Sequence, residues 1–143
     1  MVIMEIFDEK FKSNKISYVL QCLLASSTVF IILLVLDAKN NAVVISALGA
    51  SSFIAFTMPE RVSSRPRYLI GGYMEGIISG GVIHALLPFI SGIFSSGILN
   101  YAFFGALAVG LSIFLMVVIQ TEHPPAAGLA LALIINVSGP SSP

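Results

Sequence analysis

Charge is the scarcest property of this sequence. Only 10% of its 143 residues are Asp, Glu, Lys or Arg, and the formal net charge is zero, whereas a soluble domain usually carries about 25% charged residues. The sequence has no tryptophan and one cysteine, Cys22. A lone cysteine excludes an internal disulfide. The balanced charge provides no basic field that would favour nucleic acid, so we expect no nucleic-acid partner.

Residue combinations that support catalysis are also missing. The sequence has no paired carboxylates, no nucleophile at the spacing of a general base, no phosphate-binding loop and no cluster of metal ligands. We therefore expect no enzymatic activity, no cofactor and no metal site.

Hydrophobic residues dominate instead, at 57% of the sequence, and the mean hydropathy is +0.98. Five apolar segments follow the first fifteen residues: 16–36, 42–58, 68–90, 99–119 and 126–137. As helices, the first four are about 25–34 Å long and the last about 18 Å, against a bilayer core of about 30 Å. We predict an all-α, polytopic membrane protein with four full-length or near-full-length spans and a final half-helix.

The two ends of the chain differ from this membrane domain, residues 16–137. Residues 1–15 place Ile3, Ile6, Phe7 and Phe11 near helical spacing, which predicts an amphipathic helix in the membrane interface. A frayed polar tail is the alternative. Residues 138–143 are rich in Ser, Gly and Pro and cannot continue a helix. Either the last segment is a half-helix or the natural protein has been cut there.

Basic residues lie mostly at one end of the predicted spans. Three lysines precede the first span and three arginines follow the second: Lys10, Lys12, Lys15, Arg61, Arg65 and Arg67. Only Lys39 lies on the other side. Because cytoplasmic loops carry the excess of Lys and Arg, we predict a cytoplasmic N-terminus, with the segment 122–125 on the same side. We expect a prokaryotic inner (plasma) membrane.

A weak internal symmetry relates the two halves of the chain. A long segment followed by a short one occurs twice, as 16–36 with 42–58 and as 99–119 with 126–137. The two pairs start on opposite sides, so they would be inverted copies, and paired short helices in such copies indicate a transporter site. No convincing residue-level repeat accompanies the pattern, so chance is an equal alternative.

Small residues recur at four-residue spacing on two spans. Gly72, Gly76 and Gly80 form one stripe, and a second stripe consists of Ala102, Ala106 and Gly110. Such stripes let another helix backbone approach closely, either within one subunit or between subunits. Because a subunit with so few spans would need several copies to enclose a pathway, we expect a homo-oligomer.

The most informative motif is Glu122-His123-Pro124-Pro125-Ala126, between a long apolar segment and the short one. Proline suits the first turn of a helix, and a helix N-terminus attracts anions. His123 is able to donate to an anion or carry a proton. We predict a substrate site here, with capping or interfacial anchoring by His123 as the alternative.

A second candidate for substrate binding is Gly49-Ala50-Ser51-Ser52, midway through a short span. If the helix opens at Gly49, free backbone groups and the serine hydroxyls are able to coordinate a small ion. If it stays closed, these are packing residues whose serines bond to the preceding turn. The residues leave both interpretations open.

Ionisable residues inside the third span are pathway candidates, because such residues are rare and functional in membranes. Glu75 and His84 lie about 180° apart on that helix, so they cannot share a site on it. Together with Glu122 they are candidates for proton coupling. An ion pair with Arg65 or Arg67 is the alternative for Glu75, and hydrogen-bonded packing is the alternative for His84. Arg67 is also a candidate for drawing anions to the cytoplasmic mouth, or for fixing topology and contacting phospholipid.

In this order, the motifs resemble the HPP family of small integral membrane proteins. The resemblance covers residues 16–137 and is carried by residues 47–52, 59, 64–67, 71–72 and 123–126. Some members are implicated in nitrite transport in chloroplasts and cyanobacteria, which implies a nitrite-like substrate. Tyr68 and Tyr73 stand where the family commonly has Asn and His, so a two-histidine site does not carry over. Members often continue past this end with another apolar segment.

Three functions therefore compete. The leading hypothesis is a transporter or channel for a small inorganic anion, embedded in the lipid bilayer, with its site at broken helix ends. The alternatives are a non-transporting structural or sensory membrane subunit and a proton or cation pathway centred on Glu75.

Overall fold

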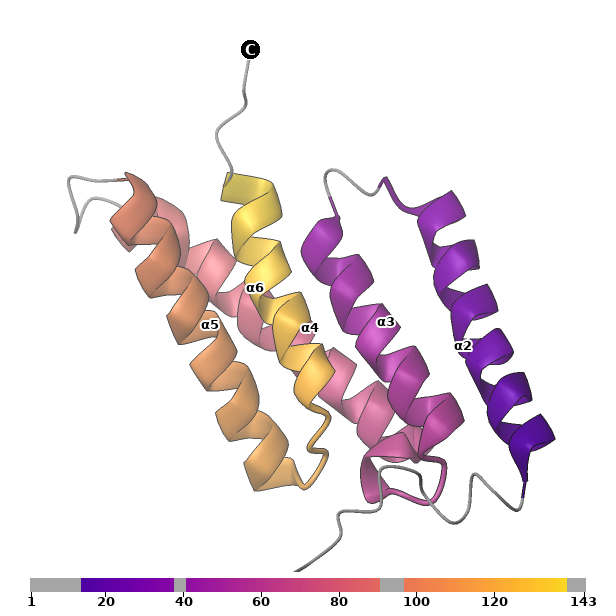
Figure 1. The fold of residues 1–143 in the computed structure, drawn as a ribbon. Coiled ribbons are helices and arrows are strands. Elements are labelled where there is room, and N and C mark those ends of the chain that lie inside the picture. The colour runs from indigo at the N-terminus through magenta and orange to yellow at the C-terminus, as the bar shows by residue number, and fades with distance from the viewer. Residues whose placement is uncertain (1–13, 38–40, 91–96, 139–143) are drawn as a thin grey trace, which may run out of the picture.

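The computed structural model describes residues 14–37, 41–90 and 97–138, and every regular element in these ranges is a helix. The described residues form five α-helices and one short 3-10 helix, and Figure 1 shows how the α-helices are arranged. In chain order they are α2 (Lys15–Val35), α3 (Ala42–Thr57), η1 (Val62–Ser64), α4 (Pro66–Ile90), α5 (Gly97–Ile119) and α6 (Pro124–Ser138). The predicted all-α class is confirmed. The predicted interfacial helix and the tail fall mostly or wholly outside the described residues.

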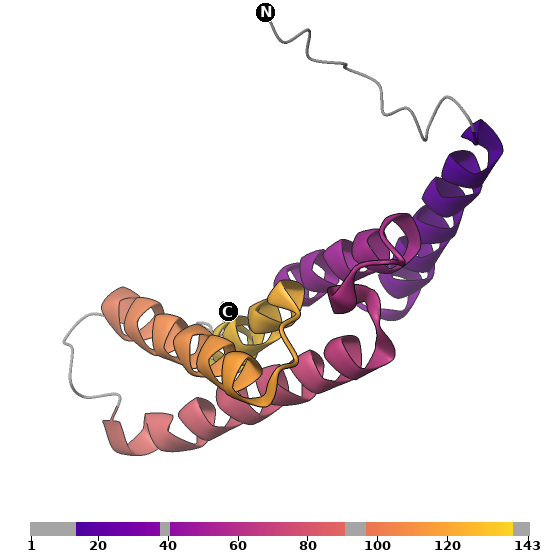
Figure 2. The ribbon, with the colours of Figure 1, turned by 90° about the horizontal axis from the view of Figure 1, so that it is seen from below.

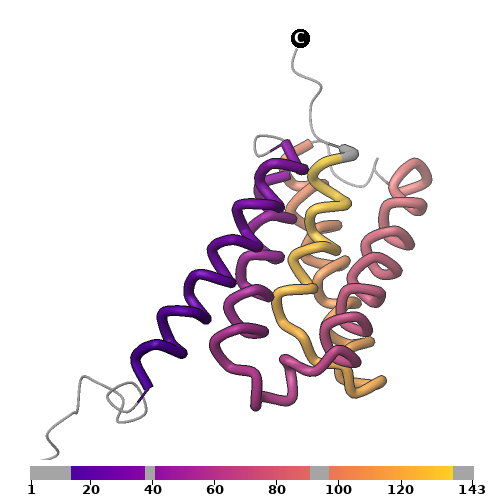
Figure 3. The backbone as a smooth tube through the Cα atoms, turned by 90° about the vertical axis from the view of Figure 1, so that its right-hand side faces the viewer, coloured from indigo at the N-terminus to yellow at the C-terminus, as the bar shows by residue number. Residues whose placement is uncertain are grey.

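Successive α-helices run in alternating directions (Figures 1 and 3). Helices α2, α4 and α5 are long and apolar enough to cross a membrane, whereas α3 and α6 are shorter apolar helices. Their 16 and 15 residues correspond to about 24 and 22 Å. Two short helices thus lie among three full-length spans.

Proline sets the start of two helices. Pro66 begins α4 and Pro124 begins α6, in both cases two residues before the apolar segment itself. A proline in the first turn loses no hydrogen bond, because the first N–H groups of a helix have no partner within it.

Helix α6 lies at the centre of the bundle, in contact with α3, α4 and α5, and α2 packs on α3 at the edge. Figure 2 shows α2 far from α4 and α5. One buried cluster joins α4, α5 and α6 and consists of Ile83, Phe104, Ala108, Ala130 and Ile134. A second lies nearer the start of α6 and consists of Met116, Ala126 and Ala127. Helix α2 has no buried residue and presents Leu, Ile, Val and Phe side chains outward.

The glycine stripe of α4 is where α6 approaches. A Cβ atom added to Gly76 would lie 2.5 Å from the carbonyl oxygen of Ala126, and one added to Gly80 would lie 2.9 Å from that of Ala130. At Gly72 it would meet the His123 Cβ at 2.8 Å. These glycines therefore pack two helices of one subunit. By contrast, Gly110 faces open space, and Ala102 and Ala106 beside it are exposed.

The two long–short helix pairs also meet in space. Helix α2 packs on α3, α5 packs on α6, and the short helices α3 and α6 contact each other while running in opposite directions (Figure 1). The candidate site lies at this contact.

Candidate binding site at the start of helix α6

A sharp turn after α5 places His123. Gln120 adopts a left-handed conformation with φ of 59°, and the Thr121 N–H donates to the Met116 carbonyl at 2.9 Å. The Gln120 N–H reaches the Val117 carbonyl at 3.4 Å. This pair of bonds is the Schellman motif that ends many helices, usually with glycine at the left-handed position. The turn directs Thr121 and His123 inward, where both are buried, while Glu122 stays exposed.

His123 is fully buried, and both of its ring nitrogens have partners. Its Nε2 lies 2.7 Å from the Ser51 hydroxyl on α3, and its Nδ1 lies 3.1 Å from the Ser63 carbonyl in η1. The Ser51 hydroxyl also lies 2.7 Å from the Tyr73 hydroxyl on α4. One imidazole thus joins α3, η1 and the start of α6, and reaches α4 through Ser51.

The donor order of this network follows from its acceptors. A carbonyl only accepts, so His123 Nδ1 carries a hydrogen, and in the neutral ring Nε2 accepts from Ser51. In the protonated ring Nε2 donates to Ser51, whose own hydrogen then turns to the Ala47 carbonyl, 3.1 Å away. His123 is therefore able to gain or lose a proton without breaking either ring hydrogen bond. Burial lowers the pKa of His123 from its ordinary value of 6.5, and the Ser63 carbonyl opposes this shift.

The local fold of η1 positions the Ser63 carbonyl. The adjacent Ser64 hydroxyl lies within hydrogen-bond distance of two carbonyls near the end of α3, those of Ile54 at 3.1 Å and Met58 at 2.5 Å. This fixes η1 under α3 and beside the start of α6. The arginines of this segment point elsewhere, because Arg61, Arg65 and Arg67 are all exposed.

Two hollows lie beside the turn that carries His123. One, of about 450 Å³, lies between α3 and α6 and is lined by Ala42, Val43, Ser46, Ala47, Ala50, Pro124, Pro125 and Gly128. The other, of about 510 Å³, lies at the loop end and is lined by Glu60, Arg61, Val62, Ser63, Tyr68 and Glu122. Pro124 of the first hollow and Glu122 of the second are the two sequence neighbours of His123. Both hollows therefore adjoin the turn that carries His123.

The start of α6 itself offers few donors. Pro124 and Pro125 have no N–H group, and the Ala126 N–H donates to the His123 carbonyl at 2.9 Å. Ala126 and Ala127 are buried against α4 and α5. Any anion here would be held mainly by side chains rather than by the free N–H groups of a helix end.

The Gly49–Ser52 segment forms closed helix rather than an opening. Helix α3 continues through Gly49, and Ser51 and Ser52 lie 3.1 and 2.9 Å from the carbonyls of Ala47 and Leu48, one turn earlier. Ser51 alone also reaches His123. Two candidate segments 72 residues apart thus share one network, whereas Ala50 lies in the adjoining hollow.

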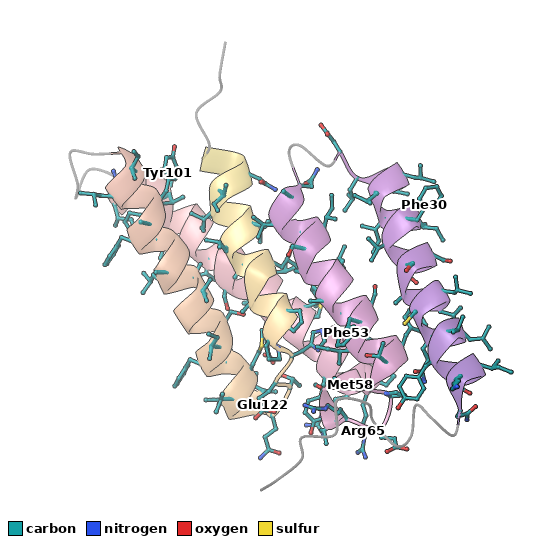
Figure 4. All side chains as sticks on the ribbon, in the orientation of Figure 1. Phe30, Phe53, Met58, Arg65, Tyr101 and Glu122 are labelled. Carbon is teal, nitrogen blue, oxygen red and sulfur yellow. The ribbon has the colours of Figure 1, made fainter. Side chains whose placement is uncertain are left out.

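The other ionisable candidates lie apart from His123. The Glu75 carboxylate is buried and accepts a hydrogen bond from the Thr121 hydroxyl at 2.6 Å. No ion pair joins it to Arg65 or Arg67, which are among the described residues. His84 is half-buried and hydrogen-bonds to none of the described side chains. Glu122 and Arg65 lie at the same end of the bundle, and Tyr101 lies at the other (Figure 4).

Three partners in these networks were not predicted from the sequence: Ser63, Tyr73 and Thr121. Tyr73 carried a signal, because it stands where the family commonly has histidine, and its ring lies 5.7 Å from that of His123. Ser63 contributes only a backbone carbonyl, for which side-chain identity gives no signal. Thr121 adjoins the His-Pro-Pro motif, yet its partner Glu75 lies 46 residues earlier.

Alternating apolar helices with a buried polar network define a polytopic integral membrane protein. The chain matches the family described as HPP, transmembrane region, over residues 11–141, and it belongs to that family. It is 34% identical over 102 residues to a transmembrane protein of Dictyostelium discoideum, a match that covers 71% of this chain and 33% of that protein. The chain thus spans about a third of the length of this curated relative. No solved structure matches it.

Proposed function

We propose that this HPP-family protein transports a small inorganic anion, of the size and charge of nitrite, past His123. The observation that carries the proposal is the fully buried imidazole of His123, with a hydrogen-bond partner on each nitrogen, in a turn whose neighbouring residues line two hollows. A membrane protein rarely buries an ionisable side chain without a functional reason.

His123 acts as the proton-carrying group in this proposal. Protonation places a positive charge in the turn beside the hollows, which attracts an anion, and the Ser51 hydroxyl adjusts by rotating towards Ala47. Because burial lowers the pKa of His123, the ring is mostly neutral at pH 7 and gains its charge as the pH falls. Anion flux is therefore expected to increase with acidity.

The test is flux of nitrite and of chloride into proteoliposomes at two pH values. His123→Gln keeps a similar volume and an amide that is able to hydrogen-bond, but it cannot carry the proton. We expect selective flux in the wild type that rises at the lower pH, and loss of both the flux and its pH dependence in the variant. His84→Gln is the matched control, because His84 lies outside the network. Equal flux in the wild type and His123→Gln would refute the proposed role.

A non-transporting structural subunit is the second candidate. It is favoured by the same two hydrogen bonds, because an imidazole with both nitrogens engaged also serves to hold α3, η1 and α6 together. Folded protein that passes neither anion, with His123→Gln less stable than the wild type, would support this function in place of transport.

Membrane orientation and assembly complete the proposal. Figure 1 shows the starts of α2 and α4 at one end of the bundle, and the end of α2 and the start of α3 at the other. The first end carries Lys15, Arg61, Arg65 and Arg67, and the second carries Asp37 and Asn41. By the positive-inside rule the first end faces the cytoplasm of a prokaryotic inner membrane. We expect no enzymatic activity.

The exposed stripe of Ala102, Ala106 and Gly110 suits contact between copies in a homo-oligomer. Ala106→Leu is expected to weaken chemical cross-linking between copies in lipid. Unchanged cross-linking would indicate that the stripe faces lipid rather than another copy.

A further inference from the structure

A second buried polar group lies on α4, apart from the His123 network. The Glu75 side chain on α4 is only 5% exposed. Its Oε1 accepts the Thr121 hydroxyl, but its Oε2 is buried and has no hydrogen-bond partner. Leaving a buried carboxylate oxygen unpaired is unfavourable in a low-dielectric environment, and more so than leaving a neutral polar atom unpaired.

Two serines with similarly free hydroxyls lie nearby. Ser79 and Ser112 are both 0% exposed, and neither hydroxyl has a hydrogen-bond partner. The other two buried serines of the described helices, Ser51 and Ser52, instead lie close to the carbonyl one turn earlier. A serine that forgoes this local bond keeps its hydroxyl available for another ligand.

The packing of α6 places these groups at one level of the bundle. Ser79 follows Glu75 by one turn and lies between Gly76 and Gly80, the glycines that meet Ala126 and Ala130 of α6. On α5, Ser112 lies one turn from Met116, which packs with Ala126, and one turn from Ala108, which packs with Ala130. Ser79 and Ser112 therefore lie on two neighbouring helices at the level of the same turn of α6.

We propose that Glu75, Ser79 and Ser112 form a buried site for one positive charge, carried either as a proton or as Na⁺. Carboxylate and hydroxyl oxygens are the ligands that hard cations prefer, and either cation would neutralise the carboxylate. The site lies between α4 and α5 at the level of Ala126 to Ala130. It is separate from the His123 network and does not depend on the proposed anion transport.

Few other titratable groups surround Glu75. Helix α6 has none along residues 124–138, and α5 has only Tyr101, at its far end. The connection before α6 contributes His123, which is engaged with Ser51 and Ser63, and the exposed Glu122. Helix α4 itself carries Arg67 and Tyr68 about two turns away, Tyr73, and His84 on the opposite face; η1 is flanked by the exposed Arg61 and Arg65.

Binding is tested on the purified chain in detergent. The unfolding temperature is measured with Na⁺ and with choline at equal ionic strength, and infrared spectra are recorded for the carbonyl stretch of a protonated carboxyl. A Na⁺-dependent rise of a few degrees that disappears in Glu75→Gln would identify Na⁺ as the ligand. A protonated-carboxyl band that is absent from Glu75→Gln, without a Na⁺ effect, would identify the proton. Neither signal in folded wild type would overturn the proposal.

Ser112→Ala provides a second test if Glu75→Gln does not fold. It removes one hydroxyl and no charge, so we expect a smaller Na⁺ shift or a displaced carboxyl band. Ser52→Ala is the control, because the Ser52 hydroxyl bonds to its own helix. A Ser112→Ala protein with unchanged Na⁺ response and band position would exclude the three-residue site. These are equilibrium measurements, so a failure of anion flux leaves their outcome unaffected.

Discussion

Substituting Gly76 by alanine tests the contact that positions α6. The added Cβ would lie 2.5 Å from the Ala126 carbonyl oxygen and 3.6 Å from the Leu129 Cβ. The first distance is shorter than any relaxed carbon–oxygen contact, and a backbone carbonyl cannot rotate away as a side chain would. Helix α6 must therefore move away from α4. Gly81 is the matched control, because nothing lies within 4 Å of the Cβ that would be added there.

The two substitutions should change the free energy of unfolding in opposite directions. Forcing an extra carbon into a tight contact costs about 1–3 kcal/mol. Replacing glycine by alanine within a helix returns about 0.5–1 kcal/mol. We therefore expect Gly76→Ala to lower the free energy of unfolding by about 1 kcal/mol, the difference between the middle values of those two terms. Gly81→Ala, which lacks the clash, should raise it by about 0.5–1 kcal/mol.

Reversible unfolding in mixed detergent micelles, followed by circular dichroism, measures this difference. The unfolding temperature should also separate the two variants: it should be lower than that of the wild type for Gly76→Ala and higher for Gly81→Ala. If both variants shift in the same direction by similar amounts, α6 does not lie in the glycine groove. The packing of His123 against α4 would then also be wrong, because the same groove continues to Gly72, which meets His123.

Three further predictions concern the turn and the network beside it. Gln120→Gly relieves a left-handed residue, and thermal unfolding should show stabilisation of about 1 kcal/mol; a destabilised variant would contradict the Schellman geometry. Because the pKa of His123 is lowered in the folded chain, the unfolded chain binds more protons below pH 6.5. Stability should therefore fall as the pH drops through that value, and a His123→Gln protein that keeps the same acid dependence would contradict this. Ser51→Ala leaves His123 Nε2 without its partner and should cost about 1–3 kcal/mol in denaturant titrations, whereas Ser52→Ala should be nearly neutral. Equal effects of the two serine variants would refute the network.

The helical bundle was largely predictable because hydrophobic segments of membrane length are a strong signal. The apolar segments match α2 to α6 to within two residues at each end. The shifts at α4 and α6 have one cause, since Pro66 and Pro124 occupy first turns that hydropathy does not register. The sequence did not indicate which helix the Gly72–Gly80 groove accepts. A stripe of glycines shows that close approach is possible, but the partner depends on how all the helices pack.

The candidate site was predictable in its residues but not in its connections. His123 and Ser51 were each identified from local features, a helix break and a small-residue segment. Their hydrogen bond joins residues 72 positions apart, and no local pattern encodes such a contact. Glu75 was identified as an intramembrane carboxylate, but its partner is Thr121 rather than an arginine. In the sequence, an arginine near a carboxylate is a stronger indication of a partner than a threonine in a distant turn. In the fold, however, the Thr121 hydroxyl is the group that reaches Glu75.

The connections matter because they relate protonation of His123 to the contact between α3 and α6. Burial disfavours the protonated ring, so each proton taken up weakens the folded arrangement that surrounds it. That arrangement consists of Ser51 on α3, Ser63 in η1 and the first turn of α6. In the proposed function, a proton on His123 would therefore favour any state in which α3 and α6 separate, and the same charge would attract an anion into the opened space. Proton uptake and anion passage are coupled in that proposal because one side chain both holds the contact and carries the charge.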